Sequence, residues 1–327
     1  MNTIAQVIVN GLGETMTEEY VSKINKLNDN ICQVVVGKDE VVKAAIVTML
    51  AGGHILLEDV PGVGKTMLAR AISGSIDGEF KRIQFTADLL PSDISGVNIF
   101  NQSENTFEFR AGPVFTNVLL GDEINRATPR TQSSLLEAME EYHITVDGVT
   151  YPLSKPFLVI ATQNPIELEG TYPLPFAQMD RFMTRLSMGY LKKELEVKML
   201  QDRIHDIPID NISSVITCEE LKEIQEAVPT IEISSELLNY TVEILSASRV
   251  HNHINVGASP RAGLDMLKFA QASALYEGRN YVLPDDIKYA ALTVLNHRIV
   301  IKRGTGNQSL SAGDLIPEIV DQVAVPV

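Results

Sequence analysis

Short apolar runs alternate with helix-like segments between residue 54 and about residue 188. Three of these runs are three to five residues long and end in polar or glycine-rich stretches, at residues 54–57, 118–120 and 157–161. Such runs are typical of strands that are buried on both faces of a parallel sheet. The alternation of strands and helices predicts an α/β fold, with helices on both faces of a parallel sheet.

Helical patterns fill the chain after the stretch RLSMGYLKKE, where the strand signals stop. Helices are expected at about 192–205, 218–228, 234–249, 260–277 and 284–300. Two of them begin with proline in the first turn, at Ser259-Pro260 and Leu283-Pro284, as helix N-termini favour. This pattern predicts a small all-helical domain after the α/β domain.

The predicted domain limits are residues 1–190 for the α/β domain, 191–303 for the helical domain and 304–327 for a C-terminal tail. Near the N-terminus, Thr15-x-x-Glu18 is a capping-box pattern that is followed by apolar positions at helical spacing, so a helix is expected to begin there. The tail starts polar, and its apolar piece DLIPEIVDQV is either a docking segment or a frayed end.

A glycine-rich loop, LLEDVPGVGKT at residues 56–66, joins the first apolar run to a helical pattern. The template for a phosphate-binding loop is G-x-x-x-x-G-K-[ST] between a strand and a helix, with the lysine on the outer phosphates and the hydroxyl on Mg²⁺. Asp59 stands at the first glycine position, whereas the rest of the template matches. The residues expected to bind nucleotide are Pro61, Gly62, Val63, Gly64, Lys65, Thr66 and Met67.

The two later strands end in polar side chains that such a site requires. The run at 118–120 leads to the acid pair, Asp122 and Glu123. Asp122 would hold Mg²⁺ together with Thr66, and Glu123 would act as general base on the attacking water. The run at 157–161 ends in TQNP, which brings Asn164 to the expected place of the γ-phosphate. Together these residues predict an ATP-hydrolysing site.

Composition restricts the partners and the compartment. The 327 residues include 27 basic and 42 acidic side chains, and the formal net charge of −15 argues against broad binding to nucleic acid or anionic membranes. No apolar run approaches the roughly 20 residues of a membrane-spanning helix, and the N-terminus lacks a basic signal-peptide start. Cys32 and Cys218 lack metal-ligand spacing. We therefore expect a cytoplasmic protein without membrane insertion.

Six segments in order resemble the MoxR family of AAA+ ATPases: VVGKDEVV, LLEDVPGVGKT, GPVFTNVLLGDEINRA, VIATQNP, GTYPLPFAQMDRF and GASPRA. The similarity extends from about residue 34 to about residue 298. It implies a AAA+ P-loop domain with a helical lid, and a ring-forming ATPase, usually a hexamer, that uses ATP and Mg²⁺ to remodel or mature client proteins. It also implies partners with von Willebrand A domains, metal-containing clients, and variation at the position of Asp59.

The resemblance also implies roles for single residues. Val36 and Gly37 lie in the stretch that packs near adenine in AAA+ proteins. Asn164 resembles sensor one, and Arg261, at the start of a lid helix, resembles sensor two.

An arginine finger that enters the neighbouring subunit's site is expected near the sequence MDRF. Arg181 resembles this finger, and Arg185 is an alternative four residues later. Either arginine could instead form a salt bridge at the edge of the core.

Two segments resemble insertions of this clade. Residues 94–110 resemble the insertion in the second helix, a hairpin-containing element expected to face the ring pore. Residues 143–153 carry a hairpin signal around Asp147-Gly148 and resemble the hairpin before sensor one. Because neither shows a recognisable aromatic pore motif, processive threading of polypeptide is not expected.

Other function classes remain as alternatives. A small-molecule P-loop kinase would share the phosphate loop, but Glu123 and Arg261 argue against it. A nucleic-acid motor or loader would share the AAA+ fold, but the acidic charge counts against it. A GTPase is disfavoured because no N-K-x-D follows the phosphate loop, and the near match NKLN lies earlier, at residues 25–28.

Overall fold

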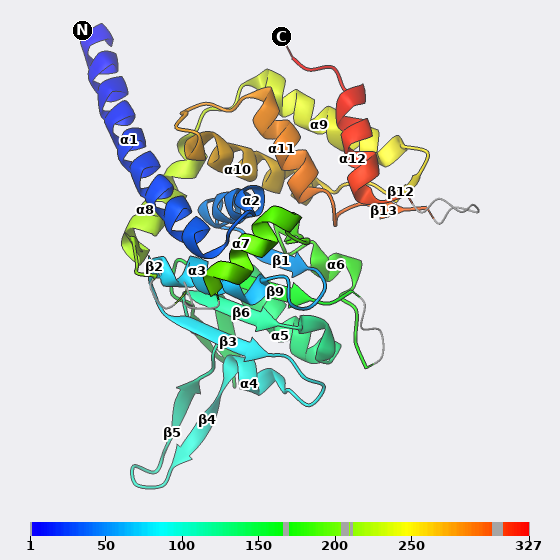
Figure 1. Cartoon of the computed structure of the whole chain (residues 1–327). Helices are drawn as coiled ribbons and strands as arrows, with labels where there is room; N and C mark the ends of the chain where they lie inside the picture. Colours follow the sequence, from blue (N-terminus) through cyan, green and yellow to red (C-terminus); the bar gives the residue numbers. More distant parts are fainter. Residues whose placement is uncertain (1, 166–169, 204–208, 210–211, 303–309, 327) are drawn as a thin grey trace. The chain divides into compact units, whose positions relative to one another are not determined.

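The computed structural model describes residues 2–165, 170–203, 209, 212–302 and 310–326 (Figure 1). The chain forms two compact units. The sheet unit comprises Asn30–Ala45 and Gly52–Lys222, and the helical unit comprises Met1–Asp29, Ile46–Ala51 and Glu223–Val327. These units are defined by contacts and differ from the predicted domain limits, which remain predictions.

Five parallel strands form the centre of the sheet unit, in the order β10-β1-β9-β6-β3. Their bounds are β1 Ile55–Glu58, β3 Phe80–Gln84, β6 Val118–Asp122, β9 Leu158–Gln163 and β10 Thr184–Leu186. Glu58 is in register with Gln163, and Gln84 with Asp122. The predicted parallel sheet is confirmed, and its register brings the carboxyl ends of neighbouring strands to one edge.

Helices surround this sheet, and its strands β1, β6 and β9 are buried along most of their length. They are α3 Lys65–Gly74, α4 Pro91–Ser95, η1 Ile124–Arg126, α5 Pro129–Glu141, α6 Phe176–Met179 and α7 Lys193–Arg203. The side chains of Leu56, Leu119 and Val159, on three adjacent strands, are fully buried in one core together with Leu135 of α5. A short parallel pair, β2 Ile76–Asp77 and β11 Ile216–Thr217, completes the unit.

Both predicted hairpins form. Strand β4 (Gly96–Asn101) pairs with β5 (Thr106–Ala111), and this hairpin extends away from the five-stranded sheet in Figure 1. Strand β7 (His143–Val146) pairs with β8 (Val149–Pro152). Asp147 and Gly148 join them with φ angles of 50° and 81°, the positive values that two-residue hairpin turns need. The placement of the first hairpin at a ring pore stays a prediction.

The remaining helices are α1 Asn2–Val34, α2 Asp39–Leu50, α8 Cys218–Ala227, α9 Ser235–Val250, α10 Pro260–Tyr276, α11 Pro284–Val294 and α12 Ala312–Gln322, with a 3-10 turn η3 at Val228–Thr230. Two expected limits were wrong. Helix α1 begins at Asn2, so Thr15 lies inside it and caps no helix end. Helix α11 ends at Val294 instead of residue 300, because Val300–Ile301 forms strand β13, which pairs with β12 (Ile254–Val256).

Helix α12 decides between the two alternatives for the tail. Five of its apolar side chains are buried: Ala312, Leu315, Ile316, Ile319 and Val320. Asp314 caps its start by accepting hydrogen bonds from the N–H and the hydroxyl of Ser311, at 2.9 and 2.6 Å. The apolar piece is therefore a packed helix, while residues 304–309 of the predicted tail lie outside the described residues. In the described part of the chain, no helix combines the length and apolar character required to cross a membrane.

Candidate functional site

The loop between β1 and α3 has the backbone shape of a phosphate loop. Gly62 and Gly64 have φ angles of 84° and 101°, which disfavour residues with a β-carbon. Gly64 is the N-cap of α3, and among the described residues no side chain caps this helix. The N–H groups of its first turn therefore keep their hydrogen-bonding capacity for an anion, and Lys65 and Thr66 begin that turn.

The amine of Lys65 lies between the loop and the end of β9. It donates to the backbone carbonyl of Asp59 and to that of Gln163, the latter at 3.3 Å. Burial lowers the pKa of Lys65, and the negative charges around it, first that of Asp59, oppose this shift. The ammonium thus has polar partners near the acid pair and no direct carboxylate ion pair within the described network.

Asp59 has a structural role at the first glycine position of the template. Its carboxylate accepts hydrogen bonds from the N–H of Val60 at 2.8 Å, the N–H of Gly189 at 2.6 Å and the hydroxyl of Ser187 at 2.8 Å. Burial raises the pKa of Asp59, but these hydrogen bonds, led by that from Gly189, lower it by more than burial raises it. The pKa of Asp59 therefore lies below its ordinary value. The departure from the template therefore connects the loop to the chain after β10.

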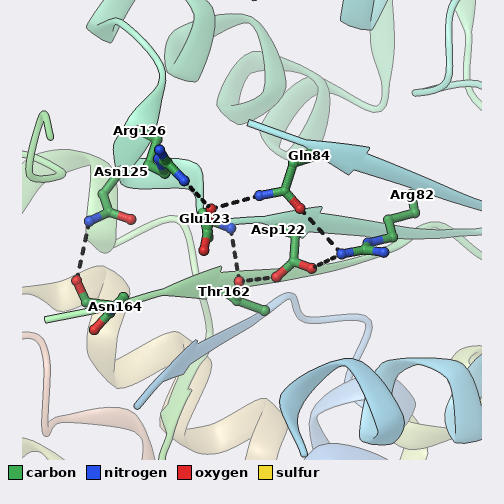
Figure 2. A network of polar contacts seen from close by, with 8 residues as sticks. All are labelled: Arg82, Gln84, Asp122, Glu123, Asn125, Arg126, Thr162 and Asn164. Carbon is green, nitrogen blue, oxygen red and sulfur yellow. Dashed lines mark hydrogen bonds and ion pairs between the residues drawn. The ribbon is translucent and has the colours of Figure 1, made fainter. Parts of the chain in front are cut away.

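The carboxylate of Asp122 lies at the end of β6 and is almost fully buried (Figure 2). The hydroxyl of Thr162, on the neighbouring strand β9, donates to its Oδ1 at 2.6 Å. The guanidinium of Arg82, from β3 on the other side, contacts its Oδ2 at 2.6 Å. Strands that are distant in sequence thus fix the orientation of this carboxylate and balance its charge.

Glu123 has a strained backbone, with φ 58° and ψ 50°, the left-handed region that non-glycine residues rarely adopt. Its N–H donates to the hydroxyl of Thr162 at 2.9 Å. Its Oε2 accepts from the side-chain amide of Gln84 at 2.7 Å and from Arg126 at 3.0 Å (Figure 2). Strain of this kind concentrates at functional sites, where the surroundings maintain it.

Asn164 follows β9 and is buried close to the acid pair. Its backbone carbonyl accepts a hydrogen bond from the side-chain amide of Asn125 at 3.3 Å (Figure 2). The sequence had suggested neither Asn125 nor four other members of this network: Arg82, Gln84, Arg126 and Thr162. The position of Thr162, two residues before Asn164 at the end of the same apolar run, is a signal that could have identified it. The strand that carries Arg82 and Gln84 is too polar for the apolar pattern that predicts a buried strand.

A pocket lies beside the phosphate loop within the sheet unit. It is lined by the predicted residues Val36, Gly62, Val63, Gly64 and Met67, and further by Val34, Val35, Lys38, Met188, Leu191 and Met199. Gly37 adjoins it, and a β-carbon built there would lie 3.3 Å from Leu191. The largely apolar lining next to the loop fits the flat face of a purine base.

The two candidate finger arginines form ion pairs inside the sheet unit. Nε of Arg181 lies 3.1 Å from Oε2 of Glu140 on α5. Nη1 of Arg185, on β10, lies 3.5 Å from Oε2 of Glu58, which directly precedes the phosphate loop. Arg261 lies in the helical unit, in the first turn of α10 after the N-cap Ser259. Which arginine acts as finger or sensor stays a prediction.

A divalent metal could be held by the hydroxyl of Thr66 and the carboxylate of Asp122. Both supply oxygen, the donor that Mg²⁺ prefers. Within the described ranges, no cluster of three or more His, Cys, Asp or Glu side chains could hold a metal alone. Mg²⁺ usually takes only one or two protein ligands and completes its shell with water and substrate phosphates, so the residues present fit it.

Comparisons with known proteins agree with this geometry. Residues 54–184 match the family described as "ATPase family associated with various cellular activities (AAA)", and residues 246–326 match the AAA lid domain. YeaC of Bacillus subtilis, described as uncharacterised, is 47% identical over 95% of this chain and 97% of its own length. Chaperone MoxR1 of Mycobacterium tuberculosis is 39% identical over 90% of this chain and 80% of its own.

A solved structure extends the likeness to the fold. A Cytophaga hutchinsonii protein, provisionally described as an ATPase, superposes with a TM-score of 0.89 at 38% identity, covering 98% of this chain and 100% of that one. The matches to the AAA domain and to the lid domain also confirm the predicted fold class. With its phosphate loop, its acid pair and relatives named MoxR, the chain belongs to the MoxR family of AAA+ ATPases.

Proposed function

We propose that the protein binds and hydrolyses ATP with Mg²⁺ and thereby drives a chaperone-like machine that remodels or matures client proteins. The observation that carries this proposal is the meeting of the phosphate loop, the acid pair and Asn164 at the carboxyl ends of β1, β6 and β9. Open α/β sheets bind ligands at this edge. The relative named Chaperone MoxR1 supports the chaperone-like role.

Binding would begin at the loop. Its backbone N–H groups would receive phosphate oxygens, and Lys65 would exchange its two carbonyl partners for the outer phosphates. Thr66 and Asp122 would hold Mg²⁺, which when bound neutralises phosphate charge. Arg82 and Thr162 keep the Asp122 carboxylate in place for this purpose. Val36 and Gly37 would border the base in the neighbouring pocket.

Glu123 would then accept a proton from the attacking water. Its Oε2 is held by Gln84 and Arg126, and its Oε1 has no hydrogen-bond partner within the described residues. One oxygen is thereby anchored while the other is available to the water, which is the geometry that a general base requires. Asn164 would help to position the water and the γ-phosphate.

We further propose that the chain works as a homo-oligomeric ring, as a hexamer, with Arg181 acting on the neighbour's γ-phosphate and Arg261 as sensor two. Arg185 suits a finger less well, because it pairs with Glu58 beside its own phosphate loop. By relation to the family, we expect partners with von Willebrand A domains, metal-containing clients and a cytoplasmic location. Cys32 and Cys218 are free thiols, in agreement with a reducing compartment.

Two variants test the assignment. Lys65→Ala should lose ATP binding, because the positive charge on the ground-state phosphates is gone. Glu123→Gln should keep binding and lose hydrolysis, since a positioned base contributes about 10²–10⁴-fold in rate. Phosphate release and calorimetric binding measure the two properties, with and without Mg²⁺. Hydrolysis by Glu123→Gln at the parental rate would show that Glu123 is not the base.

The same assay separates the alternative functions. An ATPase releases phosphate without an acceptor, whereas a small-molecule kinase needs one. Stimulation by DNA or RNA would favour a nucleic-acid motor. Glu123→Gln protein kept in ATP should also retain its partners in a pull-down, which tests the expected von Willebrand A proteins directly.

A further inference from the structure

The pocket beside the phosphate loop is lined by Met199 of α7 and by three other stretches of the sheet unit. Two are the phosphate loop and the segment around Val36 that precedes α2. The third is the β10–α7 connection, residues 187–192, which contributes Met188 and Leu191. Cε of Met188 lies 3.8 Å from a β-carbon built on Gly64, and Cδ2 of Leu191 lies 3.3 Å from one built on Gly37. This connection therefore forms one wall of the pocket.

Hydrogen bonds hold that wall to both other stretches. On the side of the phosphate loop, Oδ2 of Asp59 accepts from the N–H of Gly189 and from the hydroxyl of Ser187, at 2.6 and 2.8 Å. On the other side, the amine of Lys38 donates to the carbonyl of Tyr190 at 2.8 Å. Gly189, at the centre, has a φ of 57°, a backbone conformation that favours glycine, at the point where Asp59 contacts the connection.

Asp59 is itself fixed in orientation. Its Oδ1 accepts from the N–H of Val60 at 2.8 Å, and its backbone carbonyl accepts from the amine of Lys65. One residue thus contacts both the lysine that would bind phosphate and the wall that would border the base. A glycine at this position, as in the template, would make none of the carboxylate bonds.

We propose that Asp59 is a positioning residue for the nucleoside: it holds the β10–α7 connection against the phosphate loop and so keeps Met188 and Leu191 in the pocket. This inference rests on the proposed binding of ATP. It assigns Asp59 to nucleotide affinity and not to the chemical step, because its side chain contacts neither Glu123 nor Asp122. Changing it to the template glycine should therefore weaken ATP binding, although the sequence would then match the template better.

The test compares full-length variants. Asp59→Asn keeps the shape but places an amide donor against an N–H or hydroxyl donor, and Ser187→Ala removes one bond while the carboxylate stays. Glu104→Gln is the control variant: it removes one negative charge, as Asp59→Asn does, but in the exposed turn of the β4–β5 hairpin. The dissociation constant of ATP is measured by calorimetry, kcat by phosphate release, and the exchange of the Gly189 amide hydrogen by mass spectrometry.

We expect Asp59→Asn and Asp59→Gly to raise the dissociation constant of ATP about tenfold, equal to about 1.4 kcal/mol, with kcat at saturating ATP within about twofold of the parent. Ser187→Ala should show a smaller rise, and Glu104→Gln none. Exchange at Gly189 should become faster in the Asp59 variants before any nucleotide is added, since that amide loses its acceptor.

Three results would count against the inference, and a fourth would concern only the proposed function. An unchanged dissociation constant together with faster exchange at Gly189 would show that the wall does not influence nucleotide binding. A fall in kcat at an unchanged dissociation constant would place Asp59 in the chemical step. If Asp59 variants fail to fold, an unchanged dissociation constant in Ser187→Ala overturns the inference. A parent protein that binds ATP without hydrolysing it would refute the proposed ATPase function and leave this inference intact.

Discussion

Replacing Thr162 with valine removes one hydroxyl and keeps the shape of the side chain. That hydroxyl donates to Oδ1 of Asp122 at 2.6 Å and accepts the N–H of Glu123 at 2.9 Å. Thr162 is 1% exposed, so water cannot easily replace either bond. A hydrogen bond to a charged group contributes about 1.5–3 kcal/mol and a neutral one about 0.5–1.5 kcal/mol, so the free energy of unfolding should fall by about 2–4.5 kcal/mol.

The larger expected effect is on catalysis. Without the hydroxyl, the left-handed backbone of Glu123 loses the hydrogen bond from its N–H, and the carboxylate of Asp122 loses the hydrogen bond to its Oδ1. Both residues of the acid pair are then less firmly oriented. If part of the ~10²–10⁴-fold contribution of a positioned base is lost, kcat should fall by about 10- to 100-fold. The KM for ATP should change much less, because among the described residues the hydroxyl of Thr162 bonds to Asp122 and Glu123 and not to the side chains of the phosphate loop.

Steady-state phosphate release measures kcat and KM for the parent and three variants. Thr162→Ser keeps the hydroxyl and should restore most of the rate. Thr116→Val removes another buried hydroxyl of the sheet unit, which donates to the carbonyl of Glu79. Thr116 lies just before the start of β6, whereas Asp122 lies at its end, so this variant should lose stability without a comparable loss of kcat. The reasoning is refuted if Thr162→Val turns over at a near-parental rate, or if Thr116→Val loses kcat equally.

Two further predictions concern assembly and the tail. Arg181→Ala should bind ATP but hydrolyse it very slowly, since an arginine finger contributes about 10³–10⁵-fold to kcat. Mixing this variant with inactive Lys65→Ala should restore activity, provided that fluorescence transfer between labelled chains shows subunit exchange. Recovery in Arg185→Ala mixtures instead would identify Arg185 as the finger. Ile319→Ala, at a fully buried position of α12, should lower the free energy of unfolding, measured by urea denaturation, by about 2–5 kcal/mol. Leu238→Ala, at an exposed position of α9, should change it little. Equal effects of the two substitutions would contradict the packing of the tail helix.

Much of the architecture follows from the sequence because its signals are local. The length and period of apolar runs distinguish strands from helices within a few residues, and the phosphate loop is one continuous stretch. The acid pair and Asn164 could be predicted because each comes directly after an apolar strand, and parallel strands end at a common edge of the sheet. The hairpin around Asp147-Gly148 could be predicted from its own turn residues, whereas the hairpin within residues 94–110 was expected from the family resemblance.

Helix limits that depend on distant contacts could not be predicted in this way. The end of α11 at Val294 depends on strand β13 pairing with β12, some 45 residues earlier in the chain. The choice between a frayed and a packed tail likewise depends on burial, which only the assembled helical unit determines.

The side chains around the acid pair were decided by the tertiary structure alone. Arg82 and Gln84 lie on β3, a strand too polar to be recognised, and reach Asp122 and Glu123 only because β3 pairs with β6 in the observed register. Asp59 likewise meets Gly189 across 130 positions of the chain. The order and register of parallel strands arise from packing between segments that are far apart in sequence, and no local pattern encodes which polar side chains that packing brings together.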